Sequence, residues 1–274
     1  MFKIPAKDLA WAIHSPQVMG IINCTSDSFY AASRQKSLDS VLLKVAQFIK
    51  EGVSIVDIGA QSTRPNAQLL SADVEIEQLV PLIHGIRKAY PNLLISIDTF
   101  YASVAAASLE AGANVINDIS CGSFDPAILA VVAHQKAGFI GMHLTGSIQS
   151  MHEIEVRENI ITSLLSFFEE KKKILSAAGI QQWVIDPGFG FGKTIEENFK
   201  LVRELASLKK IGLPILLGVS RKSSIYKTLG VSAEEALNGT TMVNTVALLN
   251  DANILRVHDV KEAVELIQLL PHLK

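Results

Sequence analysis

The sequence has few of the residues that mark secreted, metal-bound or membrane proteins. Its two cysteines, Cys24 and Cys121, lack the spacing of a metal-binding pair and are too few for a disulfide scaffold. No apolar run approaches the roughly 18 residues of a membrane helix, and residues 1–15 lack the apolar core of a signal peptide. We therefore expect a soluble, cytoplasmic protein without a membrane partner.

Basic residues are not in excess either. The chain has 25 Lys and Arg against 27 Asp and Glu, a net charge of −2, and a pI of about 6.4. A broad basic face for a nucleic-acid backbone is therefore not expected. A small molecule is the predicted ligand, and nucleic acid is not.

Apolar residues, in contrast, are abundant. They make up 49% of the 274 residues, and the mean hydropathy is +0.30. A chain of this size can bury one large core, and barrels of alternating strands and helices commonly reach this length as one domain. Because the sequence has no Pro/Ser linker and no low-complexity tract, residues 1–274 are expected to form a single domain.

Short aliphatic runs alternate with longer stretches of helical period along the whole chain. Strands apolar on both faces and separated by helices indicate a parallel sheet. Eight such units predict a (β/α)8 TIM barrel, with an open doubly wound sheet as the alternative. The short N-terminal extension, residues 2–14, either caps the bottom of the barrel or adds a hairpin. The expected strands are residues 18–22, 54–58, 94–97, 115–117, 139–142, 183–185, 215–219 and 254–257.

Helix boundaries are predicted from capping residues. Ser71 is expected to begin one helix, and residues 153–178 are expected to form the longest one, with the charged residues 169–173 on a solvated face. Four glycines follow helical runs and are expected in left-handed caps. They are Gly52, Gly112, Gly138 and Gly179.

The most informative stretch is Asp186-Pro187-Gly188-Phe189-Gly190-Phe191-Gly192-Lys193. An apolar run ends at a carboxylate, and the proline and three glycines then prevent strand or helix from continuing. Glycine lets a backbone approach a ligand closely. Most Asp-Pro-Gly sequences are ordinary solvated turns, so the stretch gains weight only because other strands also end in polar residues.

In such barrels the ligand site lies at the carboxyl ends of the strands. Asp98, Asn117 and Asp186 are short side chains at such ends, where a buried carboxylate without a partner is costly. A flat heterocycle with an amino-pyrimidinone edge would satisfy them, and Lys222 would donate to the ring. For any one residue, simple strand-end polarity is an equally good explanation. The polar residues at strand ends are Asn23, Asp98, Thr99, Asn117, Asp118, His143, Asp186, Ser220, Arg221, Lys222, Arg256 and His258.

A second group is basic and predicts an anion. Arg256 and His258 lie two residues apart at the end of the last strand, hence on one face, and Arg64 lies in a loop. Barrels often bind phosphate at their last two strands, aided by a helix N-terminus. The alternative for Arg256 is an ion pair with a neighbouring carboxylate. The loops at residues 23–34, with Phe29, and 61–66 are candidate lids.

Five motifs in order resemble the dihydropteroate synthase family of the folate pathway, which sulfonamides inhibit. They begin at Met19, Ser62, Asp186, Ser220 and Arg256, and the resemblance covers nearly the whole chain. It implies that 6-hydroxymethyl-7,8-dihydropterin diphosphate and 4-aminobenzoate are converted into 7,8-dihydropteroate and diphosphate, with Mg²⁺ as cofactor. It also suggests a homodimer through the last helices, although residues 236–249 could equally belong to the core.

The resemblance also implies a role for individual residues. Lys222, Asp98, Asp186 and Arg64 would be the catalytic groups, and Asn23 would be the Mg²⁺ ligand. The expected pterin contacts are Asp98, Asn117, Asp186 and Lys222; the diphosphate contacts are Thr63, Arg64, Arg256 and His258; and the 4-aminobenzoate contacts are Phe29, Phe191, Ser220 and Lys222.

The chain departs from the family pattern in its loops, at Ser26, Ala31-Ala32-Ser33, Gln61 and Asn66, and in residues 142–147, which lack the usual Asn-Pro after the glycine. These changes bear on lid geometry, 4-aminobenzoate affinity and sulfonamide sensitivity more than on the deep pocket. Three rival functions remain open at the level of sequence. They are a corrinoid-linked methyltetrahydrofolate methyltransferase, a Schiff-base aldolase using Lys222, and a non-catalytic pterin-binding subunit.

Overall fold

A computed structural model describes residues 1–24, 31–61, 69–144, 146, 150, 153–154 and 157–273, without the side chains of 31–37. The strands are β1 (Phe2–Ala6), β2 (Leu9–Ile13), β3 (Gln17–Asn23), β4 (Ile55–Gly59), β5 (Leu94–Asp98), β6 (Val115–Asp118), β7 (Gly138–Met142), β8 (Val184–Asp186), β9 (Leu216–Leu217) and β10 (Ile254–Val257). The helices are α1 (Ala31–Glu51), α2 (Ala72–Ala89), α3 (Ala102–Glu110), α4 (Ala127–His134), α5 (Ile160–Ala177), α6 (Ile195–Arg203), α7 (Ser223–Leu229), α8 (Leu237–Leu249) and α9 (Val260–Leu269), with 3-10 helices η2 (Leu205–Ile211) and η3 (Leu270–His272).

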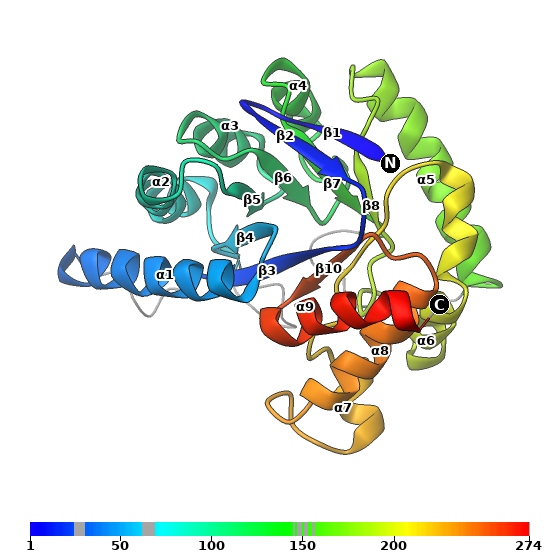
Figure 1. Cartoon of the computed structure of the whole chain (residues 1–274). Coiled ribbons are helices and arrows are strands. Elements are labelled where there is room, and N and C mark those ends of the chain that lie inside the picture. The colour runs from blue at the N-terminus through cyan, green and yellow to red at the C-terminus, as the bar shows by residue number, and fades with distance from the viewer. Residues whose placement is uncertain are drawn as a thin grey trace.

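Strands β3 to β10 form one parallel sheet in the order β8-β7-β6-β5-β4-β3-β10-β9. The two ends of this sheet meet, because Ile185 and Ile215 form a parallel bridge and the Ile185 amide donates to the Pro214 carbonyl at 3.0 Å. The helices lie around the outside of the strands (Figure 1). The predicted (β/α)8 TIM barrel is confirmed, and the open sheet is excluded. The assignment of residues 1–274 to one pterin-binding domain stays a prediction.

The N-terminal extension is a hairpin that also closes the barrel, so both alternatives for it hold. β1 and β2 pair in antiparallel fashion, and the hairpin lies beside β7 (Figure 1). Trp11 and Ile13 are each 2% exposed. They belong to a cluster with the inward residues near the starts of the barrel strands, namely Met19, Ile55, Val115, Ile140, Val184, Leu216 and Ile254. The end opposite the predicted site is therefore filled with apolar side chains.

Close packing between helix and strand explains some of the glycines. A Cβ at Gly20 in β3 would meet the Phe48 ring of α1 at 2.6 Å. Gly52, Gly112 and Gly179 have positive φ, as predicted for helix caps. Gly138 does not: it begins β7, and a Cβ there would lie 2.8 Å from the Pro5 carbonyl oxygen. The cap prediction for Gly138 was wrong because the glycine makes room for the hairpin.

Two further boundaries differ from expectation. The longest predicted helix begins only at Ile160, because Asn159 caps it by accepting from the Ile161 amide at 3.0 Å. The strand expected at 215–219 shortens to β9, after which the chain turns toward Arg221 with a φ of 54°. Within residues 169–173, Lys171 and Lys172 are not simply solvated, since each donates to a backbone carbonyl, of Cys121 and Ile211 respectively.

Candidate active site

A polar network joins four strands at the carboxyl end of the barrel. Arg256 on β10 donates from Nε to Asp57 on β4 and from Nη2 to Asp98 on β5, each at 2.6 Å. Asn117 on β6 donates from Nδ2 to Asp57 at 3.0 Å. Ser96 on β5 donates from Oγ to the other Asp57 oxygen at 2.6 Å. The strand ends therefore hold these side chains in one fixed arrangement.

Charge compensation is the physical basis of this network. Asp57 is fully buried, and a buried carboxylate requires hydrogen bonds and an opposite charge. Burial alone would lower the pKa of Arg256, but the charges of Asp57 and Asp98 outweigh burial and raise that pKa. Arg256 therefore remains a cation. Its Nη1 has no hydrogen bond within the described part of the chain.

A ligand can reach two members of this network, because 20% of the Arg256 side chain and 19% of the Asp98 side chain are exposed. Burial raises the pKa of Asp98 to about 7, and the Arg256 charge opposes the rise. The carboxylates of Asp57 and Asp186 add to it. Ionised Asp98 would be further stabilised by a ligand that brings N–H donors.

Asp186 ends β8 and is held from both sides. Its backbone oxygen accepts from the His143 amide at 2.8 Å, and its carboxylate accepts from the Gly188 amide at 2.8 Å. Burial raises the pKa of Asp186, whereas Lys222 lowers it. Gly188 is required here, because its φ is 70° and a Cβ would lie 2.2 Å from the His143 carbonyl oxygen.

Lys222 follows β9 and faces these acids. Its Nζ donates to the Phe189 carbonyl and lies 4.6 Å from the centre of the Phe191 ring. Burial lowers the pKa of Lys222 to about 8, although Asp186 and Asp98 oppose that shift. The structure therefore brings Asp98, Asp186 and Lys222 to one site.

Ser220 and His258 lie at the adjoining edge of the site. The Ser220 Oγ accepts from the His258 amide at 3.2 Å and lies 3.0 Å from its Nδ1. α9 begins at Val260, two residues later. His258 and the first amides of α9 therefore form a basic rim beside Asp98, Asp186 and Lys222.

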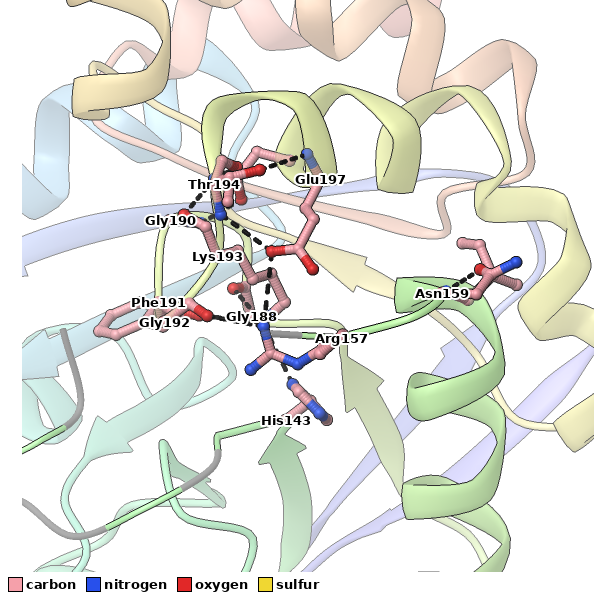
Figure 2. Close-up of polar contacts among 12 residues, drawn as sticks. His143, Arg157, Asn159, Gly188, Gly190, Phe191, Gly192, Lys193, Thr194 and Glu197 are labelled. Carbon is pink, nitrogen blue, oxygen red and sulfur yellow. Dashed lines mark hydrogen bonds and ion pairs between the residues drawn. The ribbon is translucent and has the colours of Figure 1, made fainter. Parts of the chain in front are cut away.

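The Asp186–Lys193 glycine loop is folded around the ammonium group of its own last residue. Lys193 Nζ donates to the carbonyls of Gly188 and Phe191 at 2.8 and 3.1 Å and lies 3.1 Å from Nδ1 of His143. Arg157, from the segment before α5, donates to the Gly192 carbonyl at 2.7 Å. Figure 2 shows these side chains converging.

Two hydrogen bonds join Gln61 to Leu70, which lie on either side of residues 62–68. Gln61 donates to the Leu70 carbonyl at 2.9 Å and accepts from the Leu70 amide at 3.1 Å. The same Gln61 amide donates to Glu75 on α2 at 2.7 Å. Burial raises the pKa of Glu75 to about 7, against the effect of the Gln61 hydrogen bond.

Arg221 lies between Ser220 and Lys222 in sequence, but its side chain pairs with Asp259 and not with Asp98 or Asp186. Its Nε and Nη2 donate to the two oxygens of Asp259, each at 2.9 Å. Nη1 donates to the backbone carbonyls of Ala233 and Glu234. This fork ties the β9–α7 connection to the one that follows β10.

Some of the predicted site residues fall outside the described part of the chain. They are Phe29, Thr63 and Arg64. Within the described part, the ion pair considered for Arg256 is present at two of its nitrogens. Two important side chains, Asp57 and Lys193, were missed. Asp57 could have been found as an acid inside the apolar run Ile-Val-Asp-Ile.

The predicted Mg²⁺ ligand, Asn23, ends β3 with an exposed side chain. In the described residues no cluster of three or more His, Cys, Asp or Glu could hold a metal ion. One amide oxygen fits a magnesium ion that takes its other oxygens from a bound diphosphate and water, the way Mg²⁺ commonly binds in phosphate sites. The donor set does not fit a metal cage made by protein alone.

Comparison with known proteins shows the family of this chain. The family model of pterin binding enzymes matches residues 19–258. The chain therefore belongs to the family of pterin-binding enzymes. None of the helices in the described residues is long and apolar enough to cross a membrane.

Similar proteins within this family include dihydropteroate synthases. That of Synechocystis is 39% identical over 92% of this chain and 88% of its own length. The Yersinia pestis enzyme, solved with a sulfonamide drug, has a TM-score of 0.91 and 33% identity over 99% of both chains. The Xanthomonas albilineans enzyme, solved with 4-aminobenzoic acid, has a TM-score of 0.90 and 30% identity over 99% of this chain and 97% of its own.

Proposed function

We propose that the protein condenses 6-hydroxymethyl-7,8-dihydropterin diphosphate with 4-aminobenzoate to give 7,8-dihydropteroate and diphosphate, a step of folate biosynthesis. The observation that carries the proposal is the meeting of Asp98, Asn117, Asp186 and Lys222 at the carboxyl end of the barrel. Similarity to dihydropteroate synthases over nearly the whole chain supports it.

The acids would bind the pterin ring through its N–H groups. A carboxylate pairs with an amino-pyrimidinone edge by two parallel hydrogen bonds, each worth about 1.5–3 kcal/mol when one partner is charged. The Asn117 Nδ2 is held by Asp57, so its Oδ1 faces the ligand as an acceptor. Lys222 would donate to the ring carbonyl or a ring nitrogen.

The diphosphate would lie at the basic rim. Nη1 of Arg256 would donate to this anion, while Asp57 and Asp98 hold Nε and Nη2 of the same guanidinium group. His258 and the first amides of α9 lie beside it. Thr63 and Arg64 are proposed to complete this anion site, with Arg64 acting on the leaving group.

The reaction would begin with cleavage of the bond between the pterin methylene carbon and the diphosphate oxygen, which keeps the electron pair. Arg64, Arg256 and His258 would stabilise the departing anion. Asp98 and Asp186 would stabilise the delocalised pterin cation. The amine of 4-aminobenzoate then forms the new carbon–nitrogen bond and loses a proton. Bound Mg²⁺, with Asn23 as one ligand, would supply positive charge to the diphosphate oxygens.

The 4-aminobenzoate would bind above the pterin. Phe191 and Lys222 already lie together there, and Ser220 is adjacent in sequence to the turn that carries Lys222. Phe29 is proposed to cover this ligand. An arylamine is a weak nucleophile, so exclusion of water from the cation would be essential.

Turnover of both substrates by the purified chain, with and without Mg²⁺, tests the proposal. The expected result is dihydropteroate formation that needs Mg²⁺ and falls at least about 100-fold in Lys222→Ala and in Arg64→Ala. Lys261→Ala is the matched control, because Lys261 is an exposed lysine on α9. Binding of the pterin diphosphate without turnover would instead support the non-catalytic subunit.

A homodimer is proposed through α8. Thr240, Asn244 and Leu248 face the core, whereas Met242, Val246 and Leu249 leave 62%, 38% and 44% of their surface exposed on the outer face. An exposed apolar row of this kind indicates a protein interface. Met242→Glu should therefore give a monomer in analytical ultracentrifugation, whereas Leu43→Glu on α1, a residue 73% exposed, should not.

A cytoplasmic location is proposed as well. Cys24 and Cys121 are both buried free thiols, which suits a reducing compartment. Immunolocalisation after cell fractionation would test it.

A further inference from the structure

Lys193 is a buried charged residue of the site that the proposed reaction does not use. It is only 6% exposed, and lysine is almost never buried to this extent without a specific partner. Its Nζ has three partners, at 2.8, 3.1 and 3.1 Å. The number of partners equals the number of N–H donors of an ammonium group.

All three partners are acceptors only if His143 is neutral, with its ring proton on Nε2. Burial lowers the pKa of His143 well below its usual value, and the charges of Lys193 and Arg157 lower it further. The Nδ1 lone pair can then accept from Lys193. An uncharged amine has only two N–H groups, so one of the three acceptors would lose its hydrogen bond if Lys193 lost its proton.

Two of the partners belong to the glycine loop itself. The Gly188 carbonyl follows the amide that binds the Asp186 carboxylate. The Phe191 carbonyl belongs to the residue whose ring lies beside Lys222. The third partner, His143, directly follows β7. Its position is fixed because its amide donates to the backbone oxygen of Asp186.

We propose that Lys193 is a positioning residue: its ammonium group fastens the glycine loop to His143 and so sets Phe191 against Lys222 for the second substrate. This inference rests on the proposed function. The opposite side of the loop is fastened by Asn198 of α6, which accepts from the Gly190 amide at 2.6 Å. Arg157 and Lys222 donate to further loop carbonyls, of Gly192 and Phe189. Lys193 is the one of these residues that joins the loop to His143.

The pterin site and the glycine loop should respond differently to loss of the Lys193 ammonium group. Asp98 is held by Arg256 and Asn117 by Asp57, independently of the loop. Asp186 ends β8 and takes only the Gly188 amide from the loop. Phe191 is held by the loop. Lys193→Met should therefore raise KM for 4-aminobenzoate and lower kcat, together about 10- to 100-fold in kcat/KM, since small displacements of a reacting group have effects of this size. The dissociation constant of the pterin should change less than about threefold.

Lys172→Met is the matched control. Lys172 is also a partly buried lysine that donates to a backbone carbonyl, of Ile211 at 2.7 Å, on the outer side of the barrel. The Lys172→Met variant should be less thermally stable than the wild type, with KM and kcat per pterin-binding site unchanged. Lys193→Gln keeps N–H donors but has no charge, so its kcat/KM should lie between those of the wild type and Lys193→Met. It is used in place of Lys193→Met if that variant does not fold.

The pH profile separates positioning from a purely structural role. The charged groups around Lys193 are Arg157, Asp186, Lys222 and Glu197, together with neutral His143. Burial and the Arg157 charge lower the pKa of Lys193 to about 7. The KM for 4-aminobenzoate should therefore rise with pH near 7 in the wild type. This rise should be absent in Lys193→Met, which should keep only the rise near pH 8 that Lys222 causes.

The experiment is steady-state kinetics of the full chain from pH 6 to 9, normalised to pterin-binding sites measured by calorimetry. An unchanged KM and kcat in Lys193→Met, an equal effect in Lys172→Met, or a rise in KM near pH 7 that persists in Lys193→Met would each overturn the positioning role. Failure of the proposed function is distinct from these results, because it would show as lack of turnover by the wild type itself.

Discussion

Arg256 and Asp57 are 199 residues apart in sequence, and their side chains meet at 2.6 Å at the carboxyl end of the barrel. The pair joins the first and last parts of the closed sheet, where β10 and β4 both flank β3. Asp57 is fully buried, whereas 20% of the Arg256 side chain is exposed. One face of the guanidinium group is thereby fixed and the other is left for an anion.

Replacement of Asp57 by asparagine tests this pair. Arg256 would keep Asp98 as a partner but lose half of its compensating charge, so we expect a loss of about 1–3 kcal/mol in unfolding free energy. The guanidinium group would also turn, and kcat/KM should fall about 10-fold or more. Urea unfolding and steady-state kinetics measure the two effects.

Asp251→Asn is the control for that variant. Asp251 pairs with Lys209 at the surface at 3.1 Å, and exposed pairs contribute less than about 1 kcal/mol. If Asp57→Asn lost no more stability and activity than Asp251→Asn, the proposed fixing of Arg256 would be wrong.

The pH dependence of pterin binding follows from two shifted groups. Ionised Asp98 and protonated Lys222 are both needed for the proposed contacts. Because the pKa of Asp98 is raised to about 7, affinity should increase as the pH rises through that value. Because the pKa of Lys222 is lowered to about 8, affinity should decrease above it. Calorimetric titration from pH 5.5 to 9.5 should give a maximum between these values.

Lys222→Met identifies the alkaline limb of this profile. The variant should bind pterin more weakly, with no loss of affinity above pH 8. Persistence of the alkaline limb would mean that another group, such as the ligand itself, causes it.

The fork between Arg221 and Asp259 should determine the position of Ser220 and Lys222. Arg221 has a φ of 54°, which is unfavourable for a residue with a Cβ, and its two bonds to Asp259 compensate for that strain. We expect a coupling free energy of about 1–2 kcal/mol in a double-mutant cycle of Arg221→Gln and Asp259→Asn, since both side chains are about one-fifth exposed.

The kinetics of the same cycle show whether the fork matters to the reaction. Either single variant should lower kcat/KM, and the double variant should be no worse than Arg221→Gln alone. Additive losses in kcat/KM would show that the two residues act independently.

The barrel and most of the site could be predicted because both depend on local pattern. A parallel strand that is apolar and ends in a polar residue places that residue at one end of the barrel, whichever strand it is. Asp98, Asn117, Asp186 and Lys222 were found in this way. For residues 2–14 the sequence could not show that they both form a hairpin and close the barrel, because closing the barrel depends on the strands that the hairpin covers.

What the sequence could not provide was the direction of individual side chains. Lys193 ends a glycine-rich motif, and nothing local determines that it turns inward toward His143, a residue 50 positions away. Arg256 was predicted to bind an anion or to form an ion pair, and only the positions of Asp57 and Asp98 reveal the pair. Asn159 displaced the expected helix start because its side chain bonds locally to the Ile161 amide.

Glu75 provides a test of burial that is independent of catalysis. It is fully buried, and its Oε2 has no hydrogen bond within the described residues. Its pKa is raised from 4.5 to about 7, so the folded state binds a proton between those values that the unfolded state does not. The stabilising contribution is therefore complete below about pH 4.5 and is lost as the pH rises through 7.

Glu75→Gln removes this titration while keeping an oxygen that can accept from Gln61. In urea unfolding, the wild type should lose up to about 3 kcal/mol relative to the variant between pH 5 and pH 8, following about 1.4 kcal/mol for each pKa unit. Glu77→Gln, a substitution on the same helix α2 two residues away, serves as the control and should follow the wild type. A constant difference between wild type and Glu75→Gln at all pH values would show that folding does not shift the titration of Glu75, and the proposed effect of its burial would be wrong.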